Sequence, residues 1–334
     1  MALALREVIE GLWATSRAEI QAEVADVIVF DVDGVLIDVH QSYPHVICKA
    51  VQTYLGEVGF TGEIEAVRPE ETAYFKAAGG FNSDWALAQG MALVYLVKGE
   101  AFNSRHIEAL RHSDPDLAAI ARAASAYGGG LSGLENALLN LIDLRDLDAV
   151  KARWDRARIT RLCYEYYAGD LSETVFGVPN ETISGPGLML REKPLVTRQV
   201  LERAPFRYGI YTGRNLGETE QALNLAGLTG MFAAEALITE NAGVRKPNPE
   251  GLFRIARALA PQLMIYCGDN LDDWQTAARY EAERGLDDPP CLFCGILGGS
   301  PGELAYSLFE DRGVDLMAKS AAQLVEWAAG RKRR

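Results

Sequence analysis

The sequence predicts an α/β fold, in which a doubly wound parallel sheet is interrupted by a large and mainly α-helical domain. From about residue 195 onward, short apolar runs alternate with helix-like patterns, which is typical of parallel strands with helices on both faces. A similar apolar run near residue 30 is separated from these by about 150 mostly helical residues. We therefore expect a discontinuous core, residues 1–38 and 191–334, and an inserted helical domain, residues 39–190.

The first predicted strand ends in two aspartates. Val27–Phe30 is wholly apolar, as in a buried parallel strand, and is followed by Asp31, Val32, Asp33 and Gly34. Since side chains alternate along an extended chain, Asp31 and Asp33 point the same way. Two carboxylates so close repel each other unless a cation lies between them or one keeps its proton. The pattern alone also fits a strand that ends in an Asx turn.

Polar residues follow other predicted strands as well. The remaining strands are expected at 208–211, 236–239, 263–267 and 292–297. Thr212, Gly213 and Arg214 follow one strand, and a carboxylate-rich loop with Asp269 and Asp273 follows another. Lys246 comes just before a helix start that is signalled by Asn248 as cap and Pro249 at the first position. In open α/β sheets, ligands bind beyond the carboxyl ends of the strands, where all these residues are expected.

The inserted domain is expected to contain five helices and one candidate binding loop. The helices are predicted at 43–55, 84–97, 105–126, 134–144 and 148–168, with Gly128–Gly130 in a flexible connector. Lys76 to Trp85 holds a cation, two glycines and polar residues. This segment is either a loop that contacts a phosphorylated substrate or a helix corner capped by Asn82 or Ser83.

The four polar motifs together resemble those of the haloacid dehalogenase superfamily of hydrolases, which have a Rossmann-like core. In that family the order is Asp-x-Asp, a strand ending in Thr or Ser, a Lys, and Gly-Asp-x-x-x-Asp. Here these motifs are Asp31-Val32-Asp33, Thr212, Lys246, and Gly268-Asp269 with Asp273. The resemblance covers about residues 26–40 and 190–330, and the motif sequences most resemble those of phosphoglycolate-phosphatase-like members with a helical cap.

The resemblance implies a phosphoryl-transfer mechanism. Asp31 would be the nucleophile that forms an aspartyl-phosphate, and Asp33 the general acid and base. Thr212 and the Gly213 amide would bind phosphoryl oxygens, while Lys246 would neutralise negative charge.

The resemblance also implies a Mg²⁺ site and substrate contacts. Asp31, Asp269 and the backbone carbonyl of Asp33 would bind the ion, and Asp273 would bind it directly or through water. Further substrate-binding candidates are Arg214 beside the phosphate site and Lys76 and Asn82 in the cap.

The second aspartate of the first motif narrows the activity. Family members that dehalogenate or cleave phosphonates lack it, because their leaving groups need no such proton donor. We therefore expect a Mg²⁺-dependent phosphatase acting on a small phosphorylated metabolite. The alternatives are a phosphomutase acting on a sugar phosphate and a catalytically silent binding protein on the same fold.

Composition limits the partners and the cellular location. The net charge of −13 argues against nucleic acids and anionic membrane surfaces as partners. No apolar run is long enough to span a bilayer, and Arg6, Glu7 and Glu10 lie where a signal peptide would be apolar, so we expect a cytoplasmic protein. The length of the insertion leaves room for an oligomer contact. Cys291 and Cys294 have the spacing of metal ligands but lie in an apolar run, which favours a buried strand over a zinc or redox site.

Overall fold

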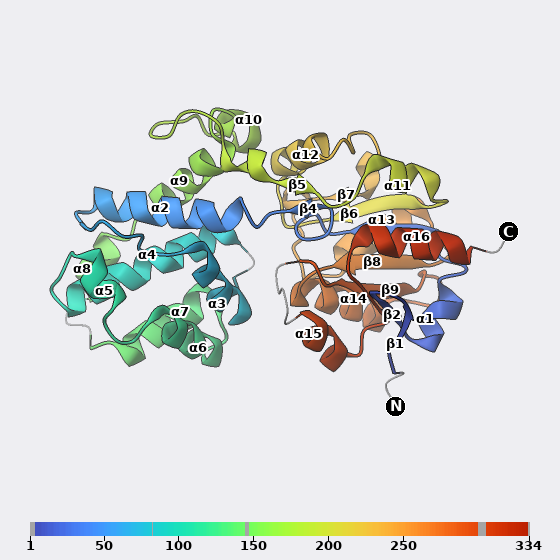
Figure 1. Cartoon of the computed structure of the whole chain (residues 1–334), viewed down its shortest axis with the longest axis horizontal. Helices are drawn as coiled ribbons and strands as arrows, with labels where there is room; N and C mark the ends of the chain where they lie inside the picture. The colour runs from blue at the N-terminus through green and yellow to red at the C-terminus, as the bar shows by residue number, and fades with distance from the viewer. Residues whose placement is uncertain (1–3, 82, 144–146, 300–304, 333–334) are drawn as a thin grey trace. The chain divides into compact units, whose positions relative to one another are not determined.

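The computed structural model describes residues 4–81, 83–143, 147–299 and 305–332. It divides the chain into two compact units, coloured by residue number in Figure 1. The first unit consists of Met1–Val39 and Glu192–Arg334 and contains the large sheet. The second unit, His40–Arg191, is helical. The chain thus leaves the first unit once and returns to it once.

The first unit is built on an eight-stranded sheet with the order β1-β2-β10-β9-β8-β3-β6-β7. These strands are β1 (Arg6–Ile9), β2 (Leu12–Ala14), β3 (Val27–Phe30), β6 (Arg207–Tyr211), β7 (Leu237–Ile238), β8 (Met264–Gly268), β9 (Cys291–Ile296) and β10 (Leu316–Ala318). The six strands from β10 to β7 are parallel, while β1 and β2 form an antiparallel hairpin against β10. The predicted parallel sheet is confirmed, with this hairpin as an addition at one edge.

Helices cover both faces of the sheet. They are α1 (Ser16–Gln21), α11 (Arg198–Arg203), α12 (Leu216–Leu225), α13 (Glu250–Leu259), α14 (Leu271–Glu283), α15 (Ala305–Arg312) and α16 (Ala321–Arg331). Val27 and Val29 of β3 face a cluster to which α13, α14 and α15 contribute, while α16 contacts β10 and α11. Ile28 and Phe30 point the opposite way and are equally buried. A central strand that is apolar on both sides is therefore explained by two covering layers.

The second unit is a helical assembly with an aromatic cluster. Its helices are α2 (Tyr43–Glu57), α3 (Thr72–Ala77), α4 (Asp84–Ala101), α5 (Ile107–Arg111), α6 (Leu117–Ala126), α7 (Gly130–Leu141), α8 (Leu147–Ala152), α9 (Arg156–Ala168) and α10 (Ser172–Phe176). Helices α2, α4 and α9 contact one another, and α6 pairs with α7. Tyr43 stacks on Tyr167 at 4.9 Å between ring centroids, and Trp85 packs edge-on against Tyr167 at 5.9 Å. Aromatic burial of this kind stabilises a small helical core.

Three of the predicted helices differ from the structure. The predicted helix 105–126 is two helices, because Pro115 cannot continue a helix and disfavours helical backbone in the residue before it. The predicted helix 148–168 is also two, since Asp155 caps α9 by accepting a hydrogen bond from the Arg158 amide at 2.9 Å. Helix α7 begins at Gly130, earlier than the expected residue 134.

A short ribbon lies where the chain passes between the two units. Strands β4 (Ile37–Asp38) and β5 (Lys193–Pro194) pair antiparallel, so the outgoing and returning segments run side by side. Among the residues that the structure describes, no helix combines the length and apolar character needed to cross a membrane.

Candidate active site

The candidate site begins at the carboxyl ends of three neighbouring strands. Strand β3 pairs in parallel with β6 on one side and β8 on the other. The residues that follow these strands are therefore brought together: Asp31 after β3, Thr212 after β6 and Asp269 after β8. These motifs are far apart in the sequence, but they meet because their strands are neighbours in the sheet.

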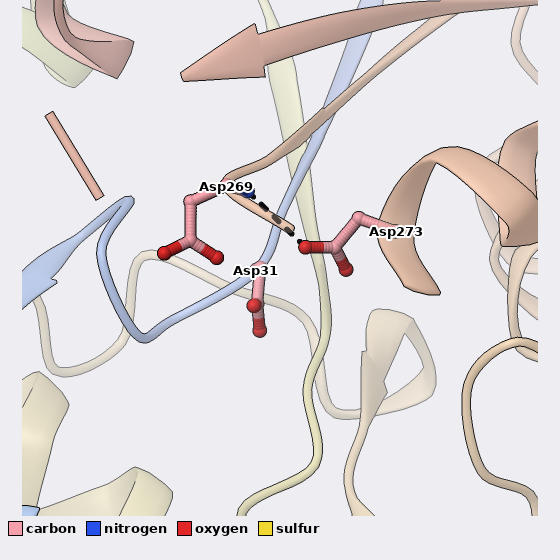
Figure 2. Close-up of side chains that lie close together, drawn as sticks. All are labelled: Asp31, Asp269 and Asp273. Atoms are coloured by element: carbon pink, nitrogen blue, oxygen red, sulfur yellow. Dashed lines mark hydrogen bonds between the residues drawn. The ribbon is translucent and has the colours of Figure 1, made fainter. Parts of the chain in front are cut away.

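Three buried carboxylates form the centre of the site. Asp31, Asp269 and Asp273 each offer a ligand atom, and these atoms all lie within 4.8 Å of one another. Figure 2 shows the three carboxylates side by side, with Asp273 contributed by the first turn of α14. The Asp269 amide donates to Asp273 Oδ2 at 3.2 Å, as the dashed line in Figure 2 marks. Asn270 caps the same helix through the Asp272 and Asp273 amides, which fixes the turn between the two aspartates.

Lys246 joins two of these carboxylates. Its Nζ lies 2.9 Å from Asp31 Oδ1 and 2.7 Å from Asp273 Oδ1, and its side chain is almost buried. Burial opposes the ammonium charge, but Asp273 and Asp31 outweigh it and raise the pKa of Lys246. The Tyr266 hydroxyl also donates to Asp273 Oδ1, at 2.6 Å. Asp273 is thus held on both oxygens by protein donors.

The charges of Asp31, Asp269, Asp273 and Lys246 do not balance one another. Three carboxylates and one ammonium give these four groups a net charge of about −2 when all are ionised. Burial is the largest cause that raises the pKa of Asp31, and the charges of Asp273, Asp33 and Asp269 raise it further, against the lowering effect of Lys246. A buried site with this excess charge suits a divalent cation with oxygen ligands, so the residues present fit Mg²⁺.

Glycines leave room for the Asp269 carboxylate. A Cβ on Gly34 would lie 2.1 Å from Asp269 Oδ2, and a Cβ on Gly299 would lie 2.2 Å from Asp269 Cβ. Gly34 also has a φ of +69°, which favours glycine. Two loops therefore approach Asp269 more closely than any other residue type would permit.

Thr212 and Gly213 form the other side of the site. Thr212 is buried, its amide donates to the Ile238 carbonyl at 3.0 Å, and its Oγ1 accepts from the Arg214 amide at 3.2 Å. Gly213 is exposed, and a Cβ there would meet no atom within 4 Å. The open space at Gly213 leaves room for a ligand next to a fixed hydroxyl.

Arg214, a predicted substrate-binding residue, directly follows Gly213. Its side chain is 1% exposed and lies between two carboxylates, Asp33 and Glu192. The charged nitrogens of Arg214 already face protein carboxylates, and its expected contact with substrate stays a prediction. Asp33 is more exposed than Arg214, with 31% of its side chain accessible to solvent. Glu192 was not predicted, since it lies in a polar stretch with no signal of burial.

The candidate residues of the cap belong to the helical unit. Lys76 belongs to the helical unit, where its Nζ lies 2.8 Å from Asp84 Oδ1. Ser83 caps α4 by accepting from the Ala86 amide at 3.4 Å, which agrees with the helix-corner interpretation of this segment. Asn82 lies outside the described residues.

The two cysteines with metal-like spacing are buried strand residues. Cys291 and Cys294 both lie in β9, every residue of which is buried. Burial raises the pKa of both thiols, which keeps them protonated. The strand interpretation is therefore confirmed.

Solved structures resemble this chain although sequence comparisons find no match. No protein-family model and no curated protein matches the sequence. Phosphatase Tt82 from Thermococcus thioreducens is 25% identical, with a TM-score of 0.51 over 85% of this chain and 99% of that one. A phosphonoacetaldehyde hydrolase-like protein from Oleispira antarctica is 13% identical, with a TM-score of 0.50 over 93% of both chains. A HAD family hydrolase from Deinococcus radiodurans is 17% identical, with a TM-score of 0.47 over 92% of this chain and 97% of that one.

The likenesses to the Thermococcus and Oleispira proteins, with TM-scores of 0.51 and 0.50, concern architecture. The sheet, the inserted helical unit and the positions of the four motifs match what the haloacid dehalogenase resemblance implies. The chain has the Rossmann-like fold of the haloacid dehalogenase superfamily of hydrolases, with a helical insertion.

Proposed function

We propose that this protein is a Mg²⁺-dependent phosphatase that hydrolyses a small phosphorylated metabolite through an aspartyl-phosphate. The observation that carries the proposal is the buried cluster of three carboxylates bridged by Lys246, with the more open Asp33 two residues from Asp31. The likeness to phosphatase Tt82 supports the same reaction class.

The metal would be held by the carboxylates of Asp31, Asp269 and Asp273, together with the backbone carbonyl of Asp33. A bound Mg²⁺ would neutralise the excess negative charge of the three carboxylates and Lys246, and it would polarise a phosphoryl oxygen. Four protein donors already hold the oxygens of Asp273, so we propose that its carboxylate is a fixed ligand that binds the ion directly or through water.

The proposed reaction consists of two displacements at phosphorus, the first by Asp31 and the second by water. In the first, an Asp31 oxygen attacks phosphorus, the ester P–O bond breaks, and Asp33 gives its proton to the leaving oxygen. In the second, water attacks the aspartyl-phosphate, passes a proton to Asp33 and releases Asp31 and inorganic phosphate. Lys246, the Thr212 hydroxyl and the Gly213 amide stabilise the charge that develops on the phosphoryl oxygens.

The substrate is proposed to be recognised by the helical unit. Lys76, at the end of α3, stays the proposed substrate contact in this unit. A cation with a carboxylate neighbour can exchange that neighbour for a phosphate or carboxylate of a ligand.

A panel of phosphomonoesters tests the proposal. Purified protein with millimolar Mg²⁺ is expected to release phosphate from at least one member, and EDTA is expected to stop the release. Asp31→Asn should abolish turnover while the circular dichroism spectrum stays unchanged, and Asp287→Asn, a change at an exposed aspartate, should have no effect. Hexose 1-phosphates belong in the panel, because isomerised sugar in place of free phosphate would indicate a mutase.

Two results would overturn the proposal. Undiminished activity in Asp31→Asn would remove Asp31 as the nucleophile. Failure of every panel member with the unmodified protein would favour a binding protein on this fold.

A further inference from the structure

Arg214 is a buried arginine that belongs to no step of the mechanism above. It lies two residues after Thr212, and its side chain reaches back to Asp33 at the end of the neighbouring strand. Arg214 Nε donates to Asp33 Oδ1 at 2.7 Å, and Nη2 lies 2.6 Å from the same oxygen. Both contacts therefore converge on a single carboxylate oxygen.

This convergence restricts Asp33 to one orientation. A half-exposed aspartate rotates freely about two side-chain bonds, and a charge-assisted bond from a planar guanidinium removes this freedom. Because Oδ1 is taken by Arg214, Oδ2 is the oxygen left to face the reacting groups. A general acid must be placed within hydrogen-bond reach of the atom that it protonates, so its orientation matters as much as its chemistry.

Glu192 in turn fixes Arg214. Its Oε2 accepts from Arg214 Nη2 at 3.0 Å, and both side chains are 1% exposed. The Glu218 carbonyl, in the first turns of α12, also accepts from Arg214 Nη1 at 3.4 Å. A buried guanidinium needs such partners, and here Nη2 contacts both Glu192 and Asp33.

We propose that Arg214 is a positioning residue for Asp33, and that Glu192 is the anchor that holds Arg214. In the phosphatase reaction proposed above, on which this inference rests, Arg214 directs Asp33 Oδ2 toward the leaving oxygen. Neither Arg214 nor Glu192 touches the phosphate.

The leaving group of the substrate separates this role from a merely structural one. An alkyl phosphate has a poor leaving group that needs a proton, whereas p-nitrophenyl phosphate has a good one that needs little help. The value of kcat/KM reports the steps up to transfer of the phosphoryl group to Asp31, so it isolates this proton donation. A misdirected Asp33 must therefore harm alkyl phosphates selectively.

The principal variant is Arg214→Gln. Its kcat/KM is expected to fall about 100-fold for the best alkyl phosphate, the lower range of general acid catalysis, and only about threefold for p-nitrophenyl phosphate. Arg214→Lys should not restore the alkyl activity, because an ammonium lacks the planar fork. Arg207→Gln is the matched control. Arg207 pairs with Asp26 at the amino ends of β6 and β3, away from the site, so kcat/KM should be unchanged for both substrates.

Two further measurements keep the inference testable if Arg214→Gln folds poorly or the panel fails. The double variant Glu192→Met with Arg214→Met leaves no buried carboxylate without a partner and should show the same selective loss. A crystal structure of either variant should show Asp33 in a different side-chain conformation. An equal loss for both substrate types, or an unmoved Asp33, would overturn the positioning role. An inactive unmodified protein with Asp33 moved in the variant would instead count against the proposed function alone.

Discussion

Gly34 offers a direct test of the carboxylate cluster, because a side chain there would strike Asp269. A Cβ on Gly34 would lie 2.1 Å from Asp269 Oδ2 and 3.0 Å from Gly299 Cα. Favourable contacts between non-bonded heavy atoms are about 3.5–4.0 Å. In Gly34→Ala the Asp269 carboxylate must therefore move by more than about 1 Å from its place beside Asp31.

The structure supplies a control that separates backbone strain from this collision. Gly227 has a φ of +68°, against +69° for Gly34, but a Cβ on Gly227 would meet no atom within 4 Å. Left-handed backbone costs an alanine about 1–2 kcal/mol, which is the expected loss of unfolding free energy in Gly227→Ala. Gly34→Ala adds an overpacking cost of about 1–3 kcal/mol. Its kcat/KM should fall about 100-fold, as expected for a 1 Å displacement in an active site.

Three measurements on the two variants check this reasoning. Urea unfolding gives the free energies, isothermal titration gives the Mg²⁺ affinity, and turnover of the best panel substrate gives kcat/KM. Gly227→Ala should keep the metal affinity and the activity of the unmodified protein. Equal stability losses in the two variants, with the Mg²⁺ affinity of Gly34→Ala unchanged, would refute the claim that Gly34 makes room for a metal ligand.

Two other predictions concern buried lysines. Lys246→Met should lower the unfolding free energy in EDTA by about 3–5 kcal/mol, because it leaves buried carboxylates unpaired. Added Mg²⁺ should then stabilise the variant more than the unmodified protein. Equal stabilisation of the two proteins by Mg²⁺ in a thermal-shift assay would contradict the charge argument. Lys98 donates to the Ser113 and Pro115 carbonyls, and its burial lowers its pKa to about 8 from an ordinary 10.5. Between these values the unfolded chain binds more protons than the folded one, so stability contributed by this group rises with pH, by about 2 kcal/mol from pH 8 to 10. The unfolding free energy of the unmodified protein minus that of Lys98→Met should show this rise, and a flat difference would contradict it.

The core was predictable because its strands carry unambiguous patterns. Val27–Phe30 is apolar at every position and is followed by turn residues, which is typical of a strand covered on both faces, and the observed β3 has these bounds. The three-residue β10, Leu316–Ala318, was missed, because so short an apolar run is equally typical of a buried helix turn. The hairpin strand β1 was missed because Arg6–Ile9 is largely exposed and polar. The break at Pro115 could have been predicted from the residue itself.

The partners within the site were less predictable than its motifs. Tyr266 lies in an apolar strand, and the need of a buried tyrosine for a hydrogen-bond partner is the only hint that it contacts Asp273. Glu192 gives no such hint, since a glutamate between an arginine and a lysine is ordinarily exposed. Its burial is decided by Arg214, 22 residues later, which the fold brings next to it. Tertiary pairing of this kind has no local signature.

The two aspartates of the first motif illustrate what the fold adds to the sequence. Their spacing predicts mutual repulsion, which the structure resolves by giving each carboxylate its own cation. Lys246 binds Asp31 and shares its charge with Asp273, while Arg214 binds Asp33 and shares its charge with Glu192. The cation of Asp31 is a compact ammonium inside a cluster with excess negative charge, where the proposed metal ion would complete the balance. The cation of Asp33 is a planar guanidinium, and two of its nitrogens contact the same carboxylate oxygen. Because an ammonium supplies point charge and a guanidinium supplies direction, this pairing supports the proposed roles of Asp31 as nucleophile and Asp33 as oriented acid.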